Sequence, residues 1–263
     1  MVAPHLTEGL TLHLKGNIAS RTYIELTLDL MRKYGATADW VNEQTIRVTP
    51  GIYEDIPITV EADWSAASYW YELAAIAAHR GHEVDITLSA LSPDSRQGDR
   101  MVAELFEPLG ISTEYTQEGA RLVNSQITVG NSLLDLDFTH CPDIAQTLAV
   151  TCCLMDIPYI FRGIQSLRIK ETDRVAALIA ELKKLGYALR TQGSEQLIWD
   201  GTRCETEECP TIATYDDHRM AMAFAPAALY RKGLTIEHPE VVTKSYPTFW
   251  KELSKINEES FKQ

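Results

Sequence analysis

An internal repeat of about 75 residues constrains the fold of this chain more than any other feature of its sequence. Three segments each run from an amphipathic helix through a glycine into two short strands. Their glycines, Gly35, Gly110 and Gly186, lie 75 and 76 residues apart. Each glycine stands where the end of a helix calls for a positive φ angle. The sequence therefore predicts one supersecondary unit that recurs along the chain.

A second set of helices is apolar nearly all round, which in a water-soluble protein predicts burial on every side. These helices are expected at about residues 65–79, 143–155 and 217–230. An aspartate leads each of them, and capping of the helix is the simple interpretation of these carboxylates. The aspartates are Asp63, Asp143, and Asp216 or Asp217. Strand-like runs follow the helices at residues 83–88, 158–162 and 234–237.

The recurring unit is therefore strand, buried helix, strand, amphipathic helix, glycine, strand and strand. This order predicts an α/β fold of repeated βαβαββ units, with the buried helices inside and the sheets outside. The pattern breaks at both ends of the chain. We therefore expect the 263-residue sequence to be completed by sequence outside it.

Composition excludes several classes of partner. A net charge of −13 argues against broad binding to nucleic acid or to an anionic membrane surface, because both need an excess of Lys and Arg. The apolar stretches fall short of the roughly 18 residues that a membrane span needs. Five cysteines, an odd number and mostly unclustered, favour a reducing cytoplasm over a disulfide framework, and their spacing does not favour zinc. An anionic ligand would therefore need a local cationic pocket.

The segment Arg168-Ile-Lys-Glu-Thr-Asp-Arg174 is the strongest candidate for such a pocket. Lys170 and Arg174 are four residues apart and are predicted to share one face of the first turn of a helix, beside Glu171. Two cations at a positive helix terminus repel each other, and a bound anionic ligand would offset this electrostatic repulsion. The alternative is a solvated helix end in which the cations pair with Asp173.

Two other segments place charge beside helix starts or in loops. His218 and Arg219 begin a helix that is otherwise apolar, where packing gives no reason for them. Lys244 is expected between a strand and a turn, and by itself it reads as an ordinary surface lysine. Asp143 and Glu171 are predicted to begin helices of one repeat, where they either neutralise the cations or transfer protons. No glycine-rich phosphate loop, zinc motif or dinucleotide fingerprint is evident.

Five segments in order resemble the 5-enolpyruvylshikimate-3-phosphate synthase family, over essentially the whole chain. They are Lys170-Glu-Thr-Asp-Arg174, Asp216-Asp-His-Arg-Met-Ala-Met222, Lys244-Ser-Tyr-Pro247, Lys15-Gly-Asn-Ile-Ala-Ser20 with Tyr23, and Glu61-Ala-Asp-Trp-Ser-Ala-Ala-Ser-Tyr69. The resemblance implies transfer of the enolpyruvyl group of phosphoenolpyruvate to the 5-hydroxyl of shikimate 3-phosphate, with loss of phosphate. It places the activity in aromatic amino-acid biosynthesis in the cytoplasm and implies no metal or organic cofactor.

The resemblance also implies that the chain is the C-terminal three-fifths of such an enzyme. Residues 1–60 are then the remnant of one substrate-binding domain, and residues 61–263 are the main domain, with three repeats of which one is incomplete. The missing N-terminal part of the same chain is the expected partner. Because a closed cleft needs both domains, we expect this chain to be inactive alone.

The resemblance assigns roles position by position. Asp143 and Glu171 correspond to catalytic proton-transfer residues. Contacts to shikimate 3-phosphate are implied for Ser20, Tyr23, Asp143, Ser166 and Lys170. Contacts to phosphoenolpyruvate are implied for Arg174, His218, Arg219 and Lys244. Ser166 departs from the family, which often has Asn there.

Two alternatives remain open. One is a related enolpyruvyl transferase that acts on UDP-N-acetylglucosamine, although the segments at residues 170–174 and 216–222 favour the shikimate enzyme. The other is a non-catalytic α/β-repeat binding module, such as a sliding clamp. A clamp calls for a basic inner helical face, whereas these inner helices are apolar along their length.

Overall fold

The computed structural model describes residues 1–16, 18, 21–130 and 132–256, and the chain divides into two compact units. Unit 1 comprises Met1–Glu61 and Asp94–Gly98, and unit 2 comprises Ala62–Pro93 and the chain from Asp99 onward. Each unit has its own cluster of buried apolar side chains. The assignment of residues 1–60 and 61–263 to two enzyme domains stays a prediction.

Unit 1 contains one helix and one small antiparallel sheet. Its elements are η1 (Ala3–His5), β1 (Leu10–His13), α1 (Arg21–Lys33), β2 (Ala38–Asn42) and β3 (Thr45–Val48). The strand order is β1-β3-β2. Leu28 and Met31 on one face of α1 belong to the same buried cluster as Ile46 and Val48 of the sheet. Gly35 follows α1 with φ of 85°, so the predicted helix, glycine and strand pair is present here.

Unit 2 holds the remaining elements. They are α2 (Trp64–His79), β4 (Asp85–Ser89), η2 (Gly98–Met101), α3 (Val102–Phe106), β5 (Leu109–Tyr115), β6 (Gly119–Ile127), β7 (Leu134–Asp137), η3 (Pro142–Ile144), α4 (Ala145–Leu154), β8 (Tyr159–Arg162), η4 (Gln165–Ile169), α5 (Arg174–Lys184), β9 (Arg190–Gln192), β10 (Gln196–Trp199), β11 (Thr211–Ile212), α6 (His218–Tyr230), β12 (Thr235–Ile236), η5 (Pro239–Lys244) and α7 (Phe249–Leu253).

The sheet topology confirms the repeated unit. In three places the strands pair in the order first, third, second: β1-β3-β2, β4-β6-β5 and β8-β10-β9. A parallel pair spans a buried helix twice, β7 with β8 around α4 and β11 with β12 around α6. Parallel neighbours need such a crossover, whereas the antiparallel pairs after each glycine need only a short turn. The α/β fold predicted from the repeat is therefore the observed one.

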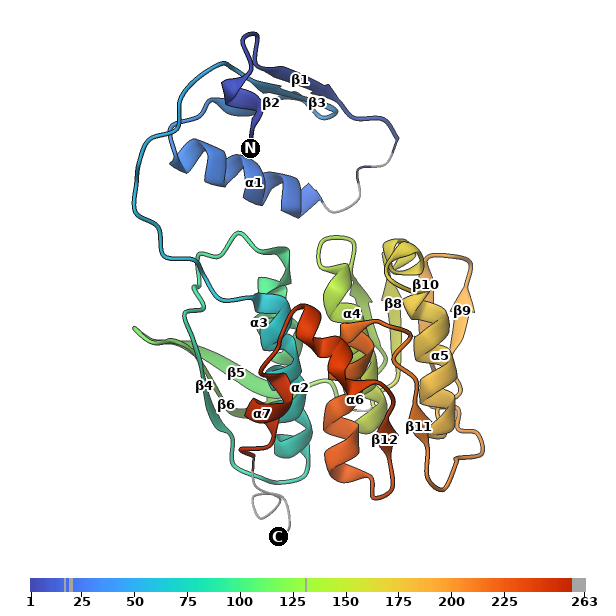
Figure 1. Ribbon diagram of the computed structural model, residues 1–263. Helices are drawn as coiled ribbons and strands as arrows, with labels where there is room; N and C mark the ends of the chain where they lie inside the picture. Colours follow the sequence, from blue (N-terminus) through green and yellow to red (C-terminus); the bar gives the residue numbers. More distant parts are fainter. Residues whose placement is uncertain (17, 19–20, 131, 257–263) are drawn as a thin grey trace. The chain divides into compact units, whose positions relative to one another are not determined.

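Helices α2, α4 and α6 form the interior of unit 2, with the strands outside them (Figure 1). Each contacts the other two, and nearly every residue of α4 is buried. Alanine at the contacts lets helices approach closely, as in the run Ala74, Ala75, Ala77 of α2 and at Ala221, Ala223 and Ala225 of α6. The prediction of three helices buried on all sides is confirmed.

The element boundaries depart from the sequence predictions in two places. Residues 143 and 144 lie in η3, so the regular part of the second buried helix begins at Ala145. Helix α3 has only five residues, because Pro108 follows it and disfavours helix at the residue before. Gly110 therefore lies inside β5 instead of at a helix end, although its φ of 92° is positive as expected.

One acidic side chain lies inside this apolar interior. Glu72 in α2 is fully buried, and neither of its carboxylate oxygens has a hydrogen-bond partner among the residues that the structure describes. Burial raises the pKa of Glu72 well above its ordinary value of 4.5. Burial without a partner therefore favours the protonated, neutral form of Glu72.

We expect Glu72→Met to stabilise unit 2 by about 1–3 kcal/mol at pH 7, because it removes an unpartnered buried polar group at similar volume. The folded state holds a proton that the unfolded chain releases above about pH 4.5, so the stability of the unsubstituted chain falls as pH rises beyond that value. Guanidinium unfolding at several pH values measures both effects.

Glu72→Gln is the matched control for this experiment. It keeps a buried polar group without a titrating proton, so it should remove the pH dependence while giving less of the stabilisation. If the Met variant unfolds at the same or a lower guanidinium concentration than the unsubstituted chain at pH 7 to 8, this interpretation of Glu72 is contradicted.

Candidate active site

Basic side chains from separate elements of unit 2 converge on carboxylates beside the starts of its helices. The basic residues are Lys170 after η4, Arg174 in α5, Arg219 in α6 and Lys244 in η5, and the carboxylates are Asp143 in η3, Glu171 before α5 and Asp217 before α6. These seven residues are called the charged cluster. Their convergence brings together positions 101 residues apart in sequence, from 143 to 244.

Arg174 lies at the centre of the charged cluster and is only 1% exposed. Its Nε donates to Asp217 Oδ2 at 2.6 Å, its Nη1 to Asp143 Oδ1 at 2.9 Å and its Nη2 to Glu171 Oε2 at 2.8 Å. The planar guanidinium has donors on several edges, so one side chain can hold three carboxylates at once. Arg174 therefore fixes the relative positions of the starts of α4, α5 and α6.

Asp143 is buried and in contact with three cations. Besides Arg174, it pairs with Lys170 Nζ through Oδ1 at 3.3 Å and accepts from Arg219 Nη2 at Oδ2 at 3.2 Å. Burial alone would raise the pKa of Asp143, but the charges of Arg219, Lys170 and Arg174 together hold it below its ordinary value. Asp143 is therefore an ionised carboxylate at neutral pH, with the electrostatic state that a proton acceptor needs.

Glu171 and Lys244 form the outer ion pair of the charged cluster. Lys244 Nζ donates to Glu171 Oε1 at 2.7 Å, while Glu171 Oε2 accepts from Arg174. The hydrogen bond from Lys244 is the largest influence on the Glu171 carboxyl, and the pKa of Glu171 is lowered to about 2. Glu171 is therefore an anion in the ligand-free protein over the whole physiological range.

A strained turn in the backbone before α6 positions Asp217 at the start of that helix. Tyr215 and Asp216 both adopt φ of 55°, a left-handed conformation that costs a non-glycine residue roughly 1–3 kcal/mol. The hydroxyl of Tyr215 donates to buried Glu181 at 2.7 Å and anchors the turn. Asp217 then caps α6 by accepting from the backbone N–H of Arg219 at 2.9 Å. The same carboxylate is thereby aimed at Arg174.

His218 lies beside the charged cluster as a neutral imidazole. It is 7% exposed, and its Nδ1 has no hydrogen-bond partner within the described part of the chain. Burial, and then the positive charge of Arg219, lower the pKa of His218 below its ordinary value of 6.5. A buried ring nitrogen without a partner is a group that a ligand could satisfy.

The prediction that Lys170 shares the first turn of a helix with Arg174 is wrong. Helix α5 begins at Arg174, because Asp173 caps it by accepting from the backbone N–H of Ala176 at 3.0 Å. Lys170 lies outside the helix in an extended conformation, and it reaches Asp143 from there. Glu171 likewise precedes α5 and does not begin it. Lys244, expected between a strand and a turn, ends the 3-10 helix η5.

The other predicted residues are placed as follows. Ser20 lies outside the residues that the structure describes. Tyr23 lies on α1 of unit 1 with its side chain exposed, and Ser166 is half-buried in η4 of unit 2. The capping interpretation holds for Asp63 and Asp217, whose side chains accept from backbone N–H groups. It fails for Asp143, because no side chain caps α4 and Asp143 bonds to cations instead.

Two functional contacts were not evident in the sequence. Asp217 was interpreted as a possible cap, and its bond to Arg174, 43 residues away, has no local signature. Asp99 was not singled out, yet it is buried, accepts a hydrogen bond from Ser65 in α2 and lies within electrostatic reach of Arg219. Burial is the largest influence on Asp99 and raises its pKa to about 6. Only the folded chain reveals that α2 also contributes to the surroundings of the site.

The charged cluster carries more positive than negative charge, in a chain whose net charge is −13. It has four cations against three carboxylates, and α5 and α6 add the positive ends of their dipoles. Such an arrangement is suited to a ligand with two or more negative charges. In the described part of the chain no group of three or more His, Cys, Asp or Glu side chains is arranged to hold a metal ion.

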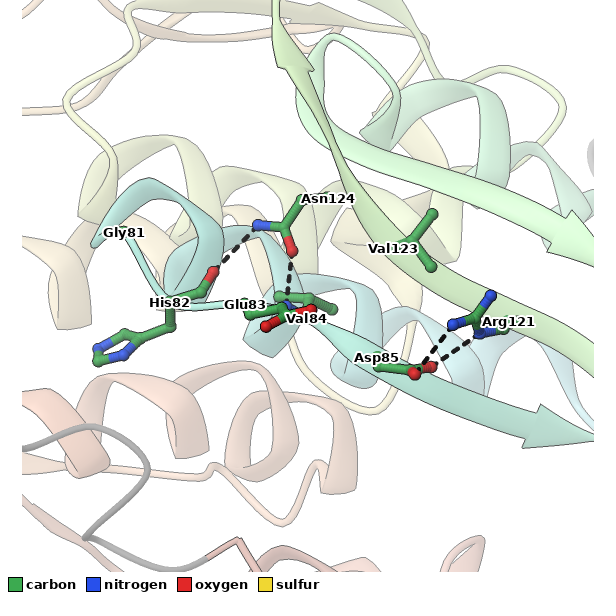
Figure 2. Close-up of a pocket in the computed structure, with 8 residues that line it drawn as sticks. All are labelled: Gly81, His82, Glu83, Val84, Asp85, Arg121, Val123 and Asn124. Carbon is green, nitrogen blue, oxygen red and sulfur yellow. Dashed lines mark hydrogen bonds and ion pairs between the residues drawn. The ribbon is translucent and has the colours of Figure 1, made fainter.

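A pocket of about 480 Å³ lies elsewhere, at the C-terminal end of α2, and has a different character (Figure 2). The side chain of Asn124 bonds the backbone at both His82 and Val84, and Arg121 pairs with Asp85. Helix α2 is about 24 Å long at 1.5 Å per residue, so this pocket is well removed from the charged cluster. Asn124, Arg121 and Asp85 are already bonded inside the pocket, which makes it a weaker candidate.

No helix in the described ranges has the length and apolar character that crossing a bilayer requires.

Comparison with known proteins relates this arrangement to one enzyme family. The family model described as EPSP synthase (3-phosphoshikimate 1-carboxyvinyltransferase) matches residues 1–253. The 3-phosphoshikimate 1-carboxyvinyltransferase of Bacteroides fragilis strain YCH46 is 51% identical over 255 residues, which are 97% of this chain and 61% of that protein. The chain thus spans about three-fifths of the length of the curated relatives that it matches.

Solved structures share the fold. An EPSP synthase from Acinetobacter baumannii aligns with a TM-score of 0.70 at 20% identity, covering 97% of this chain and 58% of that one. The enolpyruvyl transferase NikO from Streptomyces tendae aligns with a TM-score of 0.62 at 14% identity, covering 96% of this chain and 56% of that one. At these identities the likeness concerns the fold alone.

Proposed function

This chain belongs to the EPSP synthase family, and on that premise we propose that its charged cluster binds phosphoenolpyruvate for transfer of the enolpyruvyl group to the 5-hydroxyl of shikimate 3-phosphate, with release of phosphate. The chain is then part of a 3-phosphoshikimate 1-carboxyvinyltransferase of aromatic amino-acid biosynthesis. The name of the 51% identical relative supports this acceptor over UDP-N-acetylglucosamine.

One observation carries the proposal: four cations from four elements surround two carboxylates within 3.3 Å. Phosphoenolpyruvate has a phosphate at one end and a carboxylate at the other. Arg219 and Lys244 are donors on separate elements for its two ends, and His218 Nδ1 lies beside them without a hydrogen bond. The family resemblance adds Arg174, whose three guanidinium nitrogens already bond carboxylates. Donors fixed on different elements position the ligand for attack as well as binding it.

The two central carboxylates have distinct proposed roles. Asp143 accepts the proton of the attacking 5-hydroxyl, because three cations keep it ionised. Glu171 takes part in proton transfer at the methylene carbon of phosphoenolpyruvate. Contacts to shikimate 3-phosphate are proposed for Lys170 and Ser166 in unit 2, with Ser20 and Tyr23 supplied by the N-terminal part of the chain. These assignments rest on the family resemblance, and the geometry of Asp143 and Glu171 is compatible with them.

We further propose that turnover needs more than this chain. The B. fragilis relative has about two-fifths of its length outside the matched region. A polypeptide comprising that part is the proposed partner, because a transition state must be enclosed and protected from water on all sides. The assay that tests the function therefore uses the 263-residue chain with and without this polypeptide, and measures formation of enolpyruvylshikimate 3-phosphate.

We expect Arg219→Met to lower the affinity for phosphoenolpyruvate by about tenfold, as loss of a charged hydrogen bond does. Asp143 keeps Lys170 and Arg174 as partners in this variant, so the fold should persist. Isothermal titration calorimetry of the 263-residue chain measures the affinity, and UDP-N-acetylglucosamine and duplex DNA serve as comparison ligands.

Arg190→Met is the matched control, because Arg190 lies exposed on β9 with only a long contact of 3.6 Å to Asp200. It should leave the affinity unchanged. Equal binding by the Arg219 variant, or binding of UDP-N-acetylglucosamine in preference to the other ligands, contradicts the proposed function.

A further inference from the structure

The pair of Glu171 and Lys244 is the part of the charged cluster most open to solvent. The side chain of Lys244 is 57% exposed and that of Glu171 is 31% exposed, whereas Arg174 is 2% exposed. A ligand that arrives from solvent therefore meets Lys244 before it meets the buried cations. In the structure the Nζ of Lys244 donates to Glu171 Oε1 at 2.7 Å.

Glu171 is the one acidic side chain within 4 Å of Lys244 among the residues that the structure describes. The deeper cations differ, because Arg174 has Asp143 and Asp217 besides Glu171, and Lys170 and Arg219 share Asp143. Loss of Glu171 would leave Lys244 with a free charge while the others stay paired. The Glu171 carboxylate therefore controls how much positive charge the outer site offers.

The surroundings of Glu171 keep it negatively charged. Lys244 of η5 acts on it most strongly, and Arg174 of α5 adds to that effect, so that its pKa is lowered to about 2. From α6, His218 lies within electrostatic reach and is itself neutral at pH 7. An incoming phosphate thus meets a full negative charge that is bonded to the donor it needs.

We propose that Glu171 is an internal competitor for Lys244, so that anion binding exchanges the ion pair of Glu171 and Lys244 for one between Lys244 and the ligand. This autoinhibitory contact rests on the proposed function, because it concerns the same anion site. The Glu171 carboxylate gives up Lys244 when the ligand binds and keeps Arg174 as its partner. The ion pair of Glu171 and Lys244 reduces the repulsion among the cations of the site. The same ion pair lowers the affinity of the site for anions.

The two possible roles of Glu171 predict opposite effects of its removal on anion affinity. If Glu171 only held Lys244 in place for the ligand, its removal would weaken anion binding. If it competes, its removal strengthens binding, since a negative charge beside the donor repels an incoming dianion. We therefore expect Glu171→Gln to raise the affinity for a dianion by about tenfold. Gln keeps the shape of the side chain, and its oxygen can still accept from Arg174.

Calorimetric titration of the 263-residue chain with inorganic sulfate at constant ionic strength tests the exchange. Sulfate stays a dianion across the accessible pH range, so its own protonation does not contribute. Asp173→Asn is the matched control: it removes a nearby negative charge that bonds to Arg168 and caps α5, without contact to Lys244, and Asn is also a good cap. We expect the control to raise sulfate affinity much less than Glu171→Gln does.

A second variant pair isolates Lys244. In a chain that already carries Lys244→Gln, adding Glu171→Gln should produce a clearly smaller gain in sulfate affinity, because the contested donor is gone. Equal or weaker sulfate binding by Glu171→Gln overturns the exchange and leaves the proposed anion site standing. Absence of sulfate and phosphoenolpyruvate binding in every variant overturns the proposed function itself, and the exchange with it.

Discussion

Arg174→Met is expected to lower the free energy of unfolding of unit 2 by about 3–5 kcal/mol, the amount typical of removing one partner from a buried ion pair. Methionine matches the arginine stem in length, so the loss comes from charge and hydrogen bonds more than from volume. Asp217, which is fully buried, would keep its capping bond to the backbone of Arg219 and a long contact of 3.9 Å to His218 Nδ1, but no cationic partner among the described residues. Asp143 would keep Lys170 and Arg219 as partners. Most of the loss in free energy of unfolding therefore comes from Asp217.

Guanidinium unfolding followed by tryptophan fluorescence measures this effect, because four of the five tryptophans lie in unit 2. Arg162→Met is the matched control. Arg162 bonds Asp135 through two nitrogens at 2.8 and 2.6 Å, a geometry like that of Arg174, but both side chains are 47% exposed. An exposed pair contributes about 1 kcal/mol or less. Equal destabilisation by the two substitutions would show that burial of Arg174 does not matter.

The repeat predicted the fold because its signals are local. Gly35 and Gly186 follow their helices with φ near 90°, a conformation that side chains disfavour, so their spacing marks the ends of helices without reference to the rest of the chain. Helices that are apolar on all faces have no stable position except the interior, and α2, α4 and α6 lie there. Sheet order then follows from short antiparallel connections and from one crossover at each of α4 and α6.

Six of the seven residues of the charged cluster were candidates in the sequence, Asp217 being the exception, while none of the pairings was predicted. Lys170, Arg174 and Arg219 stood out because each is an unexpected charge near a helix start, whereas Lys244 reads as a surface lysine until the family resemblance is considered. Which carboxylate each cation meets depends on distances between elements that sequence spacing does not encode. The helix start at Arg174 illustrates the limit, because the single cap at Asp173 decides it and moves Lys170 out of the helix.

The burial of Glu72 has a signal in the sequence. It is an acidic residue in the middle of a helix whose other faces are apolar, so the same pattern that predicted burial of α2 also predicted burial of a carboxyl group. A buried acid without a partner is costly, and such groups call for an explanation. The expected gain in stability from Glu72→Met follows from that cost.

Asp143→Asn is expected to reduce turnover of phosphoenolpyruvate and shikimate 3-phosphate by on the order of a hundredfold or more, as loss of a general base does. Asn keeps the size of the side chain and one oxygen that can accept from Arg174 or Arg219, but it cannot take up a proton. Turnover is measured with the 263-residue chain supplied with the proposed partner polypeptide. Asp173→Asn is the control, since it changes the same chemical group outside the contacts of Asp143.

The low pKa of Asp143 bears on how it could act as a base. In the ligand-free protein Arg219, Lys170 and Arg174 hold its pKa below the ordinary value of 3.8, and a base so weak accepts a proton poorly. An anionic ligand that binds Arg174, Arg219 and Lys170 offsets their charge, so the pKa of Asp143 rises in the complex and its basicity increases where it is needed.

Because Asp143 must be ionised to accept a proton, turnover should fall at acid pH only once the pH drops through the pKa of Asp143 in the complex. That acid limb should therefore lie at higher pH in the profile of kcat than in that of kcat/KM, which reports the free enzyme. Asp143→Asn should abolish this limb together with most of the rate. A variant that keeps more than about a third of the turnover, or that keeps the acid limb unchanged, would assign the proton to another group.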